Sequence, residues 1–194
     1  MIAPSADPNT NARLISEAAL FAAHAHGAQT RADKGDPYLV HLAEVAALCA
    51  HCEPFDPVLV AAAWLHDTVE DTGVREPIVR ERFGDEIADL VMDVSDPPDL
   101  KGDARRQRQV EHTRDAGDRV KRLKLADKTS NVEELLDLPQ AAFDVEANAR
   151  YLHWARKVVD VCRGLEPQLE AQFDRSAARL EAEIEAARKR ESKS

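Results

Sequence analysis

Residues 64–72 place metal-binding and acid-base side chains at the end of a strongly apolar segment. The apolar residues before this run predict a helix, whose 3.6-residue period stacks His66 over Glu70. The same period places Asp67 over both Glu70 and Asp71. Carboxylates crowded against apolar residues are costly unless a positive charge neutralises them. The run therefore predicts a cation site.

A second polar cluster interrupts another apolar segment, at residues 120–131. Asp127 and Asn131 are four residues apart, so they share one face of the predicted helix. A buried aspartate needs a partner, and either a basic side chain, Lys124 or Lys128, or a metal would neutralise Asp127. Taken with the first run, this cluster suggests that both belong to one site.

The composition indicates an all-α protein. The chain has 194 residues, enough for one domain or for one domain with a helical tail. Aromatic residues are only 5%, and alanine and leucine recur where a sheet protein would carry valine and isoleucine. The formal net charge of -10 argues against non-specific binding of nucleic acid, which needs a basic face. Basic residues gather locally at 31–34, 105–108 and 121–128, either as solvated helix faces or as a cationic pocket.

The three cysteines, Cys49, Cys52 and Cys162, form no paired framework and suit a reducing compartment. The Cys49-Ala-His-Cys52 spacing resembles a zinc or redox motif, but it lacks a second pair or a βαβ context, which favours buried thiols on a helix. No stretch reaches the roughly 20 apolar residues of a membrane span, and the N-terminal residues do not show the charged region followed by an apolar core that is typical of a signal peptide. We therefore expect a soluble, cytoplasmic protein without membrane contact.

The hydrophobic pattern predicts a single bundle of about eight to ten helices. We expect a flexible N-terminus over 1–10, one domain over 11–165, and a C-terminal helix over 166–194 that packs on the domain and has a frayed end. The expected helices cover about 11–28, 38–51, 57–72, 76–83, 85–94, 103–115, 118–136, 144–162 and 167–190.

The two clusters, together with His41, resemble the motifs of a known family. His41, His66-Asp67 and Asp127, in the contexts PYLVHLAEVA, AAWLHDTVEDTG and LKLADKTSNV, are similar to the metal-binding pattern of HD-domain phosphohydrolases. More narrowly, they resemble the alarmone hydrolase domain of the RelA/SpoT homologues in its free-standing small form. The similarity runs from HAHGAQTRADKGDPY to RYLHWARKVVDVCRGLEPQLE, and Leu42 stands where the family commonly has proline.

The resemblance implies a metal site and its catalytic helpers. Its expected metal ligands are His41, His66, Asp67 and Asp127. Two imidazoles and two carboxylates offer mixed nitrogen and oxygen donors, which suit one Mn²⁺ ion per chain better than a closed structural zinc site. Glu70 and Asp71 are expected to assist the attacking water.

The resemblance also implies substrate contacts. Arg31 would lie against the nucleotide base, Asn131 near the ribose, Tyr151 near a phosphate, and Lys34 is a further candidate for phosphate binding. The implied reaction is hydrolysis of guanosine 3′,5′-bis(diphosphate), ppGpp, or its pentaphosphate relative at the 3′ position, which gives GDP or GTP plus pyrophosphate. Two alternatives stay open: an HD-type phosphatase of another nucleotide such as NADPH, and a non-catalytic nucleotide-binding module. The sequence does not decide between a monomer and a homo-oligomer.

Overall fold

The computed structural model describes residues 7–31 and 35–192 and confirms the all-α prediction. Within this part of the chain the β structure amounts to one isolated bridge, between Thr30 and Pro37. No helix there is both long and apolar enough to cross a bilayer. The elements are α1 (Pro8–His26), α2 (Leu39–Ala50), α3 (Pro57–Leu65), α4 (Thr68–Asp71), α5 (Glu76–Phe83), α6 (Asp85–Val94), α7 (Gly102–Asp115), α8 (Asp118–Leu136), η1 (Gln140–Ala142), α9 (Val145–Asp160) and α10 (Pro167–Glu191).

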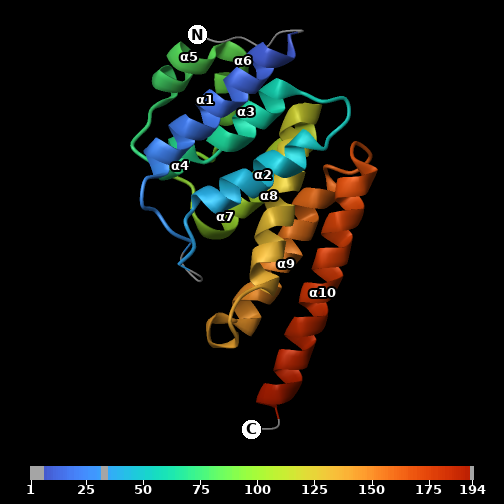
Figure 1. Cartoon of the computed structure of the whole chain (residues 1–194). Coiled ribbons are helices and arrows are strands. Elements are labelled where there is room, and N and C mark those ends of the chain that lie inside the picture. The colour runs from blue at the N-terminus through green and yellow to red at the C-terminus, as the bar shows by residue number, and fades with distance from the viewer. Residues whose placement is uncertain (1–6, 32–34, 193–194) are drawn as a thin grey trace.

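The short helix α3 lies at the centre of the upper part of the molecule (Figure 1). Seven of its nine residues are buried, because a helix that is apolar on every side must be covered on every side. Asp56 caps its N-terminus by accepting hydrogen bonds from the backbone N–H groups of Val58 and Leu59, at 3.0 and 3.3 Å. α1, α2, α6 and α8 pack around it.

The predicted single helix over 57–72 is wrong, because α3 ends at Leu65 and α4 begins at Thr68. His66 is the C-cap of α3, and Asp67, with φ -100° and ψ -2°, precedes α4. The predicted stacking of His66 over Glu70 in one continuous helix is therefore wrong as well. The turn instead brings His66 and Asp67 toward one point, which a straight helix would not do.

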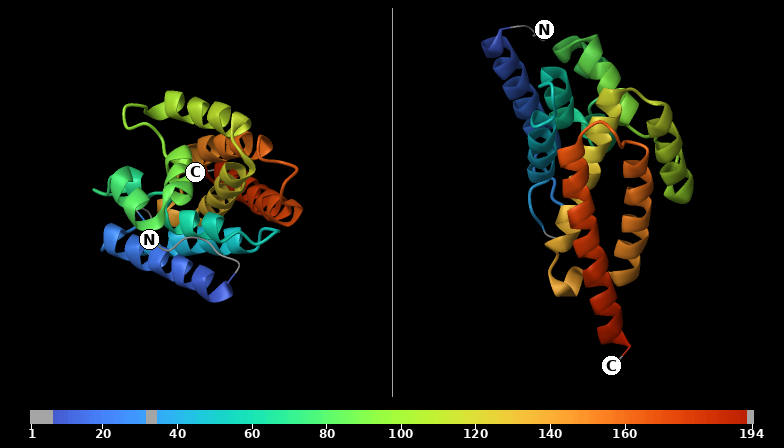
Figure 2. Two further views of the ribbon diagram at one scale, coloured as in Figure 1. Left: turned by 90° about the horizontal axis from the view of Figure 1, so that it is seen from above. Right: turned by 90° about the vertical axis from the view of Figure 1, so that its right-hand side faces the viewer.

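The lower part of the molecule consists of α8, α9 and α10, with α10 extending past the other two toward the C-terminus (Figures 1 and 2). The buried apolar core runs without a break from Leu14 in α1 to Ala187 in α10. α1 begins at Pro8, earlier than the expected residue 11, and Asp7 caps it by accepting from the N–H of Asn9 at 3.1 Å. The first six residues of the expected flexible N-terminus, and the last two of the frayed end, lie outside the described residues.

Candidate metal centre and active site

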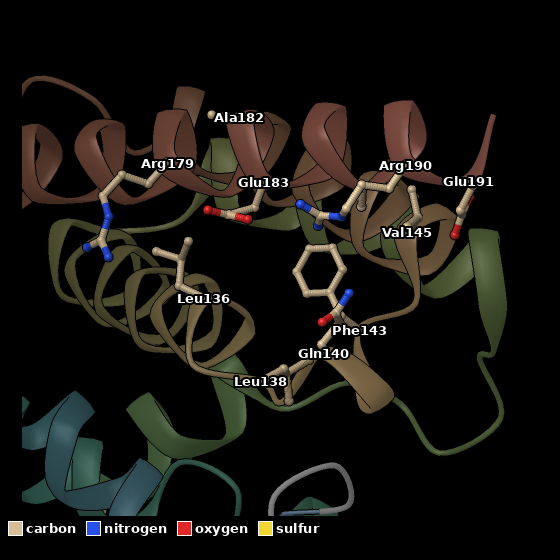
Figure 3. Close-up of a pocket in the computed structure, with 11 residues that line it drawn as sticks. Leu136, Leu138, Gln140, Phe143, Val145, Arg179, Ala182, Glu183, Arg190 and Glu191 are labelled. Atoms are coloured by element: carbon tan, nitrogen blue, oxygen red, sulfur yellow. The ribbon is translucent and has the colours of Figure 1, made fainter. Parts of the chain in front are cut away.

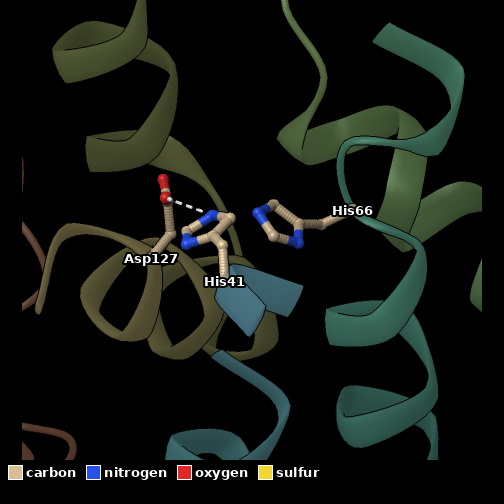
Figure 4. Close-up of side chains that lie close together, drawn as sticks. All are labelled: His41, His66 and Asp127. Carbon is tan, nitrogen blue, oxygen red and sulfur yellow. Dashed lines mark ion pairs between the residues drawn. The ribbon is translucent and has the colours of Figure 1, made fainter. Parts of the chain in front are cut away.

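His41, His66 and Asp127 meet in the interior of the molecule (Figure 4). One donor atom from each lies within 4.8 Å of the others, and the residues are 2%, 4% and 7% exposed. His41 comes from α2, His66 from the end of α3, and Asp127 from the middle of α8. Oδ2 of Asp67 lies 3.1 Å from Nε2 of His66 and 3.6 Å from Nε2 of His41. The four expected ligands are thus gathered at one place.

The orientation of His66 fits a divalent cation. Its Nδ1 lies 2.8 Å from the carbonyl oxygen of Ala63, which can only accept, so Nδ1 carries a hydrogen. Its Nε2 is buried and has no hydrogen-bond partner that meets geometric criteria, although Asp67 is close. Burial lowers the pKa of His66, but the Asp67 carboxylate outweighs burial and raises it above its ordinary value. The carboxylates thus favour positive charge here, which a metal ion supplies as well as a proton does.

The Asp127 carboxylate is fixed from two sides. Lys128 donates to its Oδ2 at 2.8 Å, and Asn131 donates to its Oδ1 at 2.5 Å. Burial raises the pKa of Asp127, but Lys128, His66 and His41 together lower it well below its usual range. Asp127 is therefore ionised and oriented, with Oδ1 only 3.6 Å from Nε2 of His41.

Glu70 and Asp71, the expected handlers of water, lie on the short helix α4. Burial, the largest effect, raises the pKa of both carboxyl groups. Glu70 accepts from the backbone N–H of Asp96 at 3.0 Å through Oε2 and pairs with Arg105 through Oε1. Asp71 lies within 3.1 Å of the hydroxyl of Tyr38. Both acids therefore stay beside the metal donors, and Glu70 is the more firmly held.

A cavity of about 420 Å³ joins the metal donors to a cationic wall. Its polar lining includes the acids and also basic side chains from α7 and α8. The basic run at 105–108, for which a solvated helix face and a cationic pocket were both open, lies on α7 and contributes Arg105 and Arg106 to this lining. The lining residues are Tyr38, His41, Asp67, Glu70, Asp71, Gly102, Arg105, Arg106, Gln109, Lys124, Asp127, Lys128, Asn131, Tyr151 and Trp154.

Two buried lysines one turn apart on α8 differ in their surroundings. Burial and the neighbouring Lys128 lower the pKa of Lys124, whose Nζ donates to the carbonyl oxygen of Val94 at 2.6 Å. Burial also acts on Lys128, but Asp127 outweighs it and raises its pKa. Nζ of Lys128 lies 4.4 Å from the ring centroid of Trp154, within cation–π range. The wall thus holds firmly placed positive charge for an anionic ligand.

The expected substrate residues divide into three groups. Asn131 and Tyr151 line the cavity, and the Tyr151 hydroxyl is buried without a hydrogen-bond partner. Arg31 is not among the lining residues; it is 8% exposed, pairs with Glu134, and donates to Oδ1 of Asn131 at 3.0 Å. Lys34 lies outside the described residues.

Sequence reasoning missed three groups that shape the site: Tyr38, Arg105 and Asp96. Tyr38 lies between two carboxylates, and Arg105 joins Glu70 to Asp96 in the lining of the cavity. A basic run on a charged helix was the one signal for Arg105. Tyr38 had none, because only the folded chain brings it to Asp67.

A larger cavity of about 670 Å³ lies elsewhere, between the end of α8, η1, the start of α9 and α10 (Figure 3). Its lining mixes apolar side chains such as Leu136 and Phe143 with Arg179, Glu183 and Arg190. It contains none of the expected ligands or acids. We therefore take the smaller cavity, which His41, Asp67 and Asp127 line, as the candidate active site.

Comparisons with known proteins agree with this geometry. A family model described as an HD domain matches residues 18–156. The guanosine-3′,5′-bis(diphosphate) 3′-pyrophosphohydrolase MESH1 of Xenopus tropicalis is 34% identical over 168 residues, covering 86% of this chain and 94% of the relative. The Mus musculus MESH1 is 37% identical over 163 residues, covering 83% and 91%.

A solved structure indicates the same family. It is described as a metazoan ortholog of SpoT that hydrolyzes ppGpp and plays a role in starvation responses. It matches with a TM-score of 0.79 at 32% identity and covers 89% of this chain and 94% of that one. The chain is therefore a member of the HD-domain family and belongs with the small MESH1 proteins related to SpoT.

Proposed function

We propose that this chain is a metal-dependent hydrolase that removes pyrophosphate from the 3′ position of ppGpp and its pentaphosphate relative. The observation that carries the proposal is the convergence of His41, His66, Asp67 and Asp127 beside a cavity that two further acids and several basic side chains line. The names of the MESH1 relatives supply the substrate. The products are GDP or GTP plus pyrophosphate.

The proposed cofactor is one Mn²⁺ ion held by these four residues. Two imidazole nitrogens and two carboxylate oxygens are a mixed donor set of the kind that suits manganese. When bound, a divalent cation lowers the pKa of a water molecule and neutralises charge on phosphoryl oxygens. The unpartnered Nε2 of His66 and the ionised Asp127 support this choice of ligands.

Asp71 is the residue we assign to proton transfer from the attacking water. Burial and the nearby Asp67 raise its pKa, which makes its carboxylate a better proton acceptor than an exposed aspartate. One carboxylate oxygen of Glu70 accepts from Arg105 and the other accepts from the backbone N–H of Asp96. We therefore assign Glu70 to orienting the water and to holding α7 in place. Attack at the 3′ phosphorus breaks its bond to the ribose oxygen and releases pyrophosphate.

The cationic wall would bind the phosphates. Lys124, Lys128, Arg105 and Arg106 line the same cavity as the acids, and their positive charge would offset the charge of the diphosphate. Burial raises the pKa of Tyr151 to about 12, so its hydroxyl stays protonated at neutral pH. That hydroxyl, buried without a partner, is placed to donate a hydrogen bond to a phosphate or to the leaving ribose oxygen.

The remaining assignments concern the nucleoside and the chain as a whole. Asn131 would contact the ribose, Arg31 the base, and Lys34 a phosphate, although Arg31 would first have to exchange its present partners. Residues 11–165 would carry the catalytic domain and 166–194 would support it by packing. Three buried free thiols support a cytoplasmic location.

A substrate panel tests the proposal. Protein stripped by a chelator and reloaded with Mn²⁺, Mg²⁺ or Zn²⁺ is incubated with ppGpp, its pentaphosphate relative and NADPH, and both pyrophosphate and phosphate are measured. We expect pyrophosphate from the two alarmones with Mn²⁺ and none after chelation. Phosphate from NADPH without pyrophosphate from either alarmone would identify a different nucleotide phosphatase. Binding without turnover would identify a non-catalytic module.

A variant pair tests the assigned acid. Asp71→Asn is expected to lower kcat by about 10²–10⁴-fold, because it removes the proton acceptor and keeps the shape. Asp93→Asn, a matched change on the exposed part of α6, is expected to leave kcat unchanged. Full activity of Asp71→Asn would contradict the assignment.

A further inference from the structure

We propose that Ser130 and Glu44 form a positioning pair that holds His41 in the tautomer required of a metal ligand. Ser130 Oγ lies 2.9 Å from Nδ1 of His41 and donates to Oε2 of Glu44 at 2.7 Å. Ser130 is 1% exposed, and Glu44, whose side chain is 47% exposed, reaches it from the surface of α2. The inference rests on the proposed function only in taking His41 as a ligand.

The number of available hydrogens determines the donor and the acceptor in each of the two hydrogen bonds that link His41, Ser130 and Glu44. A serine hydroxyl has one hydrogen, and a carboxylate can only accept, so the hydrogen of Ser130 points to Glu44. The oxygen of Ser130 is then left to accept from His41, and Nδ1 of His41 must carry the imidazole hydrogen. The lone pair is consequently on Nε2, the atom that faces Oδ2 of Asp67 and Oδ1 of Asp127, each at 3.6 Å.

The same network reaches a second expected ligand through Arg31. Nη1 of Arg31 lies 3.5 Å from Oε2 of Glu44, and its Nη2 donates to Asn131, which in turn donates to Asp127. Arg31 is almost fully buried, so its guanidinium is a fixed point between the two branches. Two ligands on different helices are thereby oriented by one set of side chains behind them, an arrangement known to tune metal affinity.

The test measures metal binding and the imidazole tautomer, with no substrate present. Mn²⁺ affinity is determined by EPR titration for the wild type, Ser130→Ala, Ser130→Thr and Glu44→Ala. The matched control is Ser176→Ala, because Ser176 is also buried and donates to a glutamate, Glu133, at 3.0 Å, but on α10 and away from the site. In the metal-free proteins, ¹⁵N NMR of the imidazoles reports which nitrogen of His41 carries the hydrogen.

We expect Ser130→Ala to weaken Mn²⁺ binding by about 10–100-fold and to lose the Nδ1–H tautomer of His41. Ser130→Thr, which retains the hydroxyl, should restore most of the affinity, and the Ser176→Ala control should match the wild type. Glu44→Ala, at an exposed position that does not threaten folding, should show the same loss in weaker form. Wild-type affinity and an unchanged tautomer in Ser130→Ala would overturn the proposal.

The outcomes also separate this inference from the proposed function. If the wild type bound Mn²⁺ but released no pyrophosphate from ppGpp, the substrate would be wrong and the positioning pair would still be supported by the affinity series. If the wild type bound no Mn²⁺, the metal assignment would fail, and an unchanged His41 tautomer in Ser130→Ala would overturn the pair independently.

Discussion

The hydroxyl of Tyr38 lies 2.6 Å from Oδ2 of Asp67, the atom that faces both histidines of the metal centre. The same hydroxyl is 3.1 Å from Oδ2 of Asp71. A phenol has one hydrogen, so the shorter contact takes it in the absence of other ligands. Tyr38 therefore links an expected metal ligand to the expected proton acceptor.

Replacement of Tyr38 by phenylalanine should lower kcat by about 10–100-fold, because Asp67 loses the hydrogen bond that orients it and Asp71 loses its hydroxyl neighbour. Phenylalanine keeps the ring, which stacks on His26 at a centroid distance of 5.0 Å, so the fold should be retained. Steady-state kinetics at saturating Mn²⁺ measures the effect, with circular dichroism as the check on folding. An unchanged kcat would mean that Asp67 and Asp71 are held by other groups.

Lys128→Met should destabilise the metal-free protein by about 3–5 kcal/mol, because it leaves the buried Asp127 carboxylate without its cation. Mn²⁺ should recover part of this loss, since the ion supplies positive charge at the same carboxylate. Urea unfolding with and without Mn²⁺ measures both effects. Lys121→Met, on the more exposed part of α8, is the control and should change little. If Mn²⁺ stabilised the wild type and Lys128→Met equally, Lys128 and Mn²⁺ would not both neutralise the Asp127 carboxylate.

Arg105→Ala should lower kcat by about 10-fold or more, because it frees Glu70. The change in unfolding free energy should stay within about 1 kcal/mol, since the Arg105 side chain is 44% exposed and solvent weakens its ion pairs. Arg108 provides a matched control, because in the described part of the chain it pairs with Asp96 at 3.3 Å and not with Glu70. If Arg108→Ala reduced kcat as strongly, the effect would belong to Asp96 and α7 rather than to Glu70.

Asp96 should make folding stability depend on pH in the acid range. Burial raises the pKa of Asp96, but hydrogen bonds from Arg105 and Gln109 outweigh it and hold the pKa below the usual 3.8. A lowered folded-state pKa contributes stability that is present above the unfolded value of about 3.9 and is lost as the pH falls through the folded value. Asp96→Asn should therefore cost about 1.5–3 kcal/mol at pH 7 and progressively less below pH 4. Urea unfolding of both proteins between pH 7 and 3 tests this, and a constant difference would contradict it.

Most helices could be predicted because each carries its own local signal. Asp56 and Pro57 mark the start of α3, and Gly84, whose φ of 89° few other residues tolerate, separates α5 from α6. The interruption after Leu65 could not be predicted, because Val69 continues the apolar period across it. Polar residues that turn toward a shared centre overrode the local pattern there.

The expected ligands could be proposed because histidine and aspartate are conspicuous within apolar segments. Their partners could not, because the contacts join distant parts of the chain: Tyr38 and Asp67 are 29 positions apart, and Arg31 and Asn131 are 100 apart. The sequence left open whether a lysine or a metal neutralises Asp127. The structure shows that Lys128 does so at least in part, because its Nζ donates to Oδ2 of Asp127 at 2.8 Å. The sequence predicted that Arg31 lies against a base, but it could not reveal that the guanidinium of Arg31 forms an ion pair with Glu134.

The expected ligands lie on α2, in the turn after α3 and in the middle of α8, and their donor atoms meet only in the folded core. An ion bound there would act as a cross-link between three parts of the chain that otherwise open separately. Amide hydrogen exchange should then slow together in α2, α3 and α8 on metal binding, while the far end of α10 keeps its own rate. The candidate metal centre would in this way also stabilise the packing of these helices.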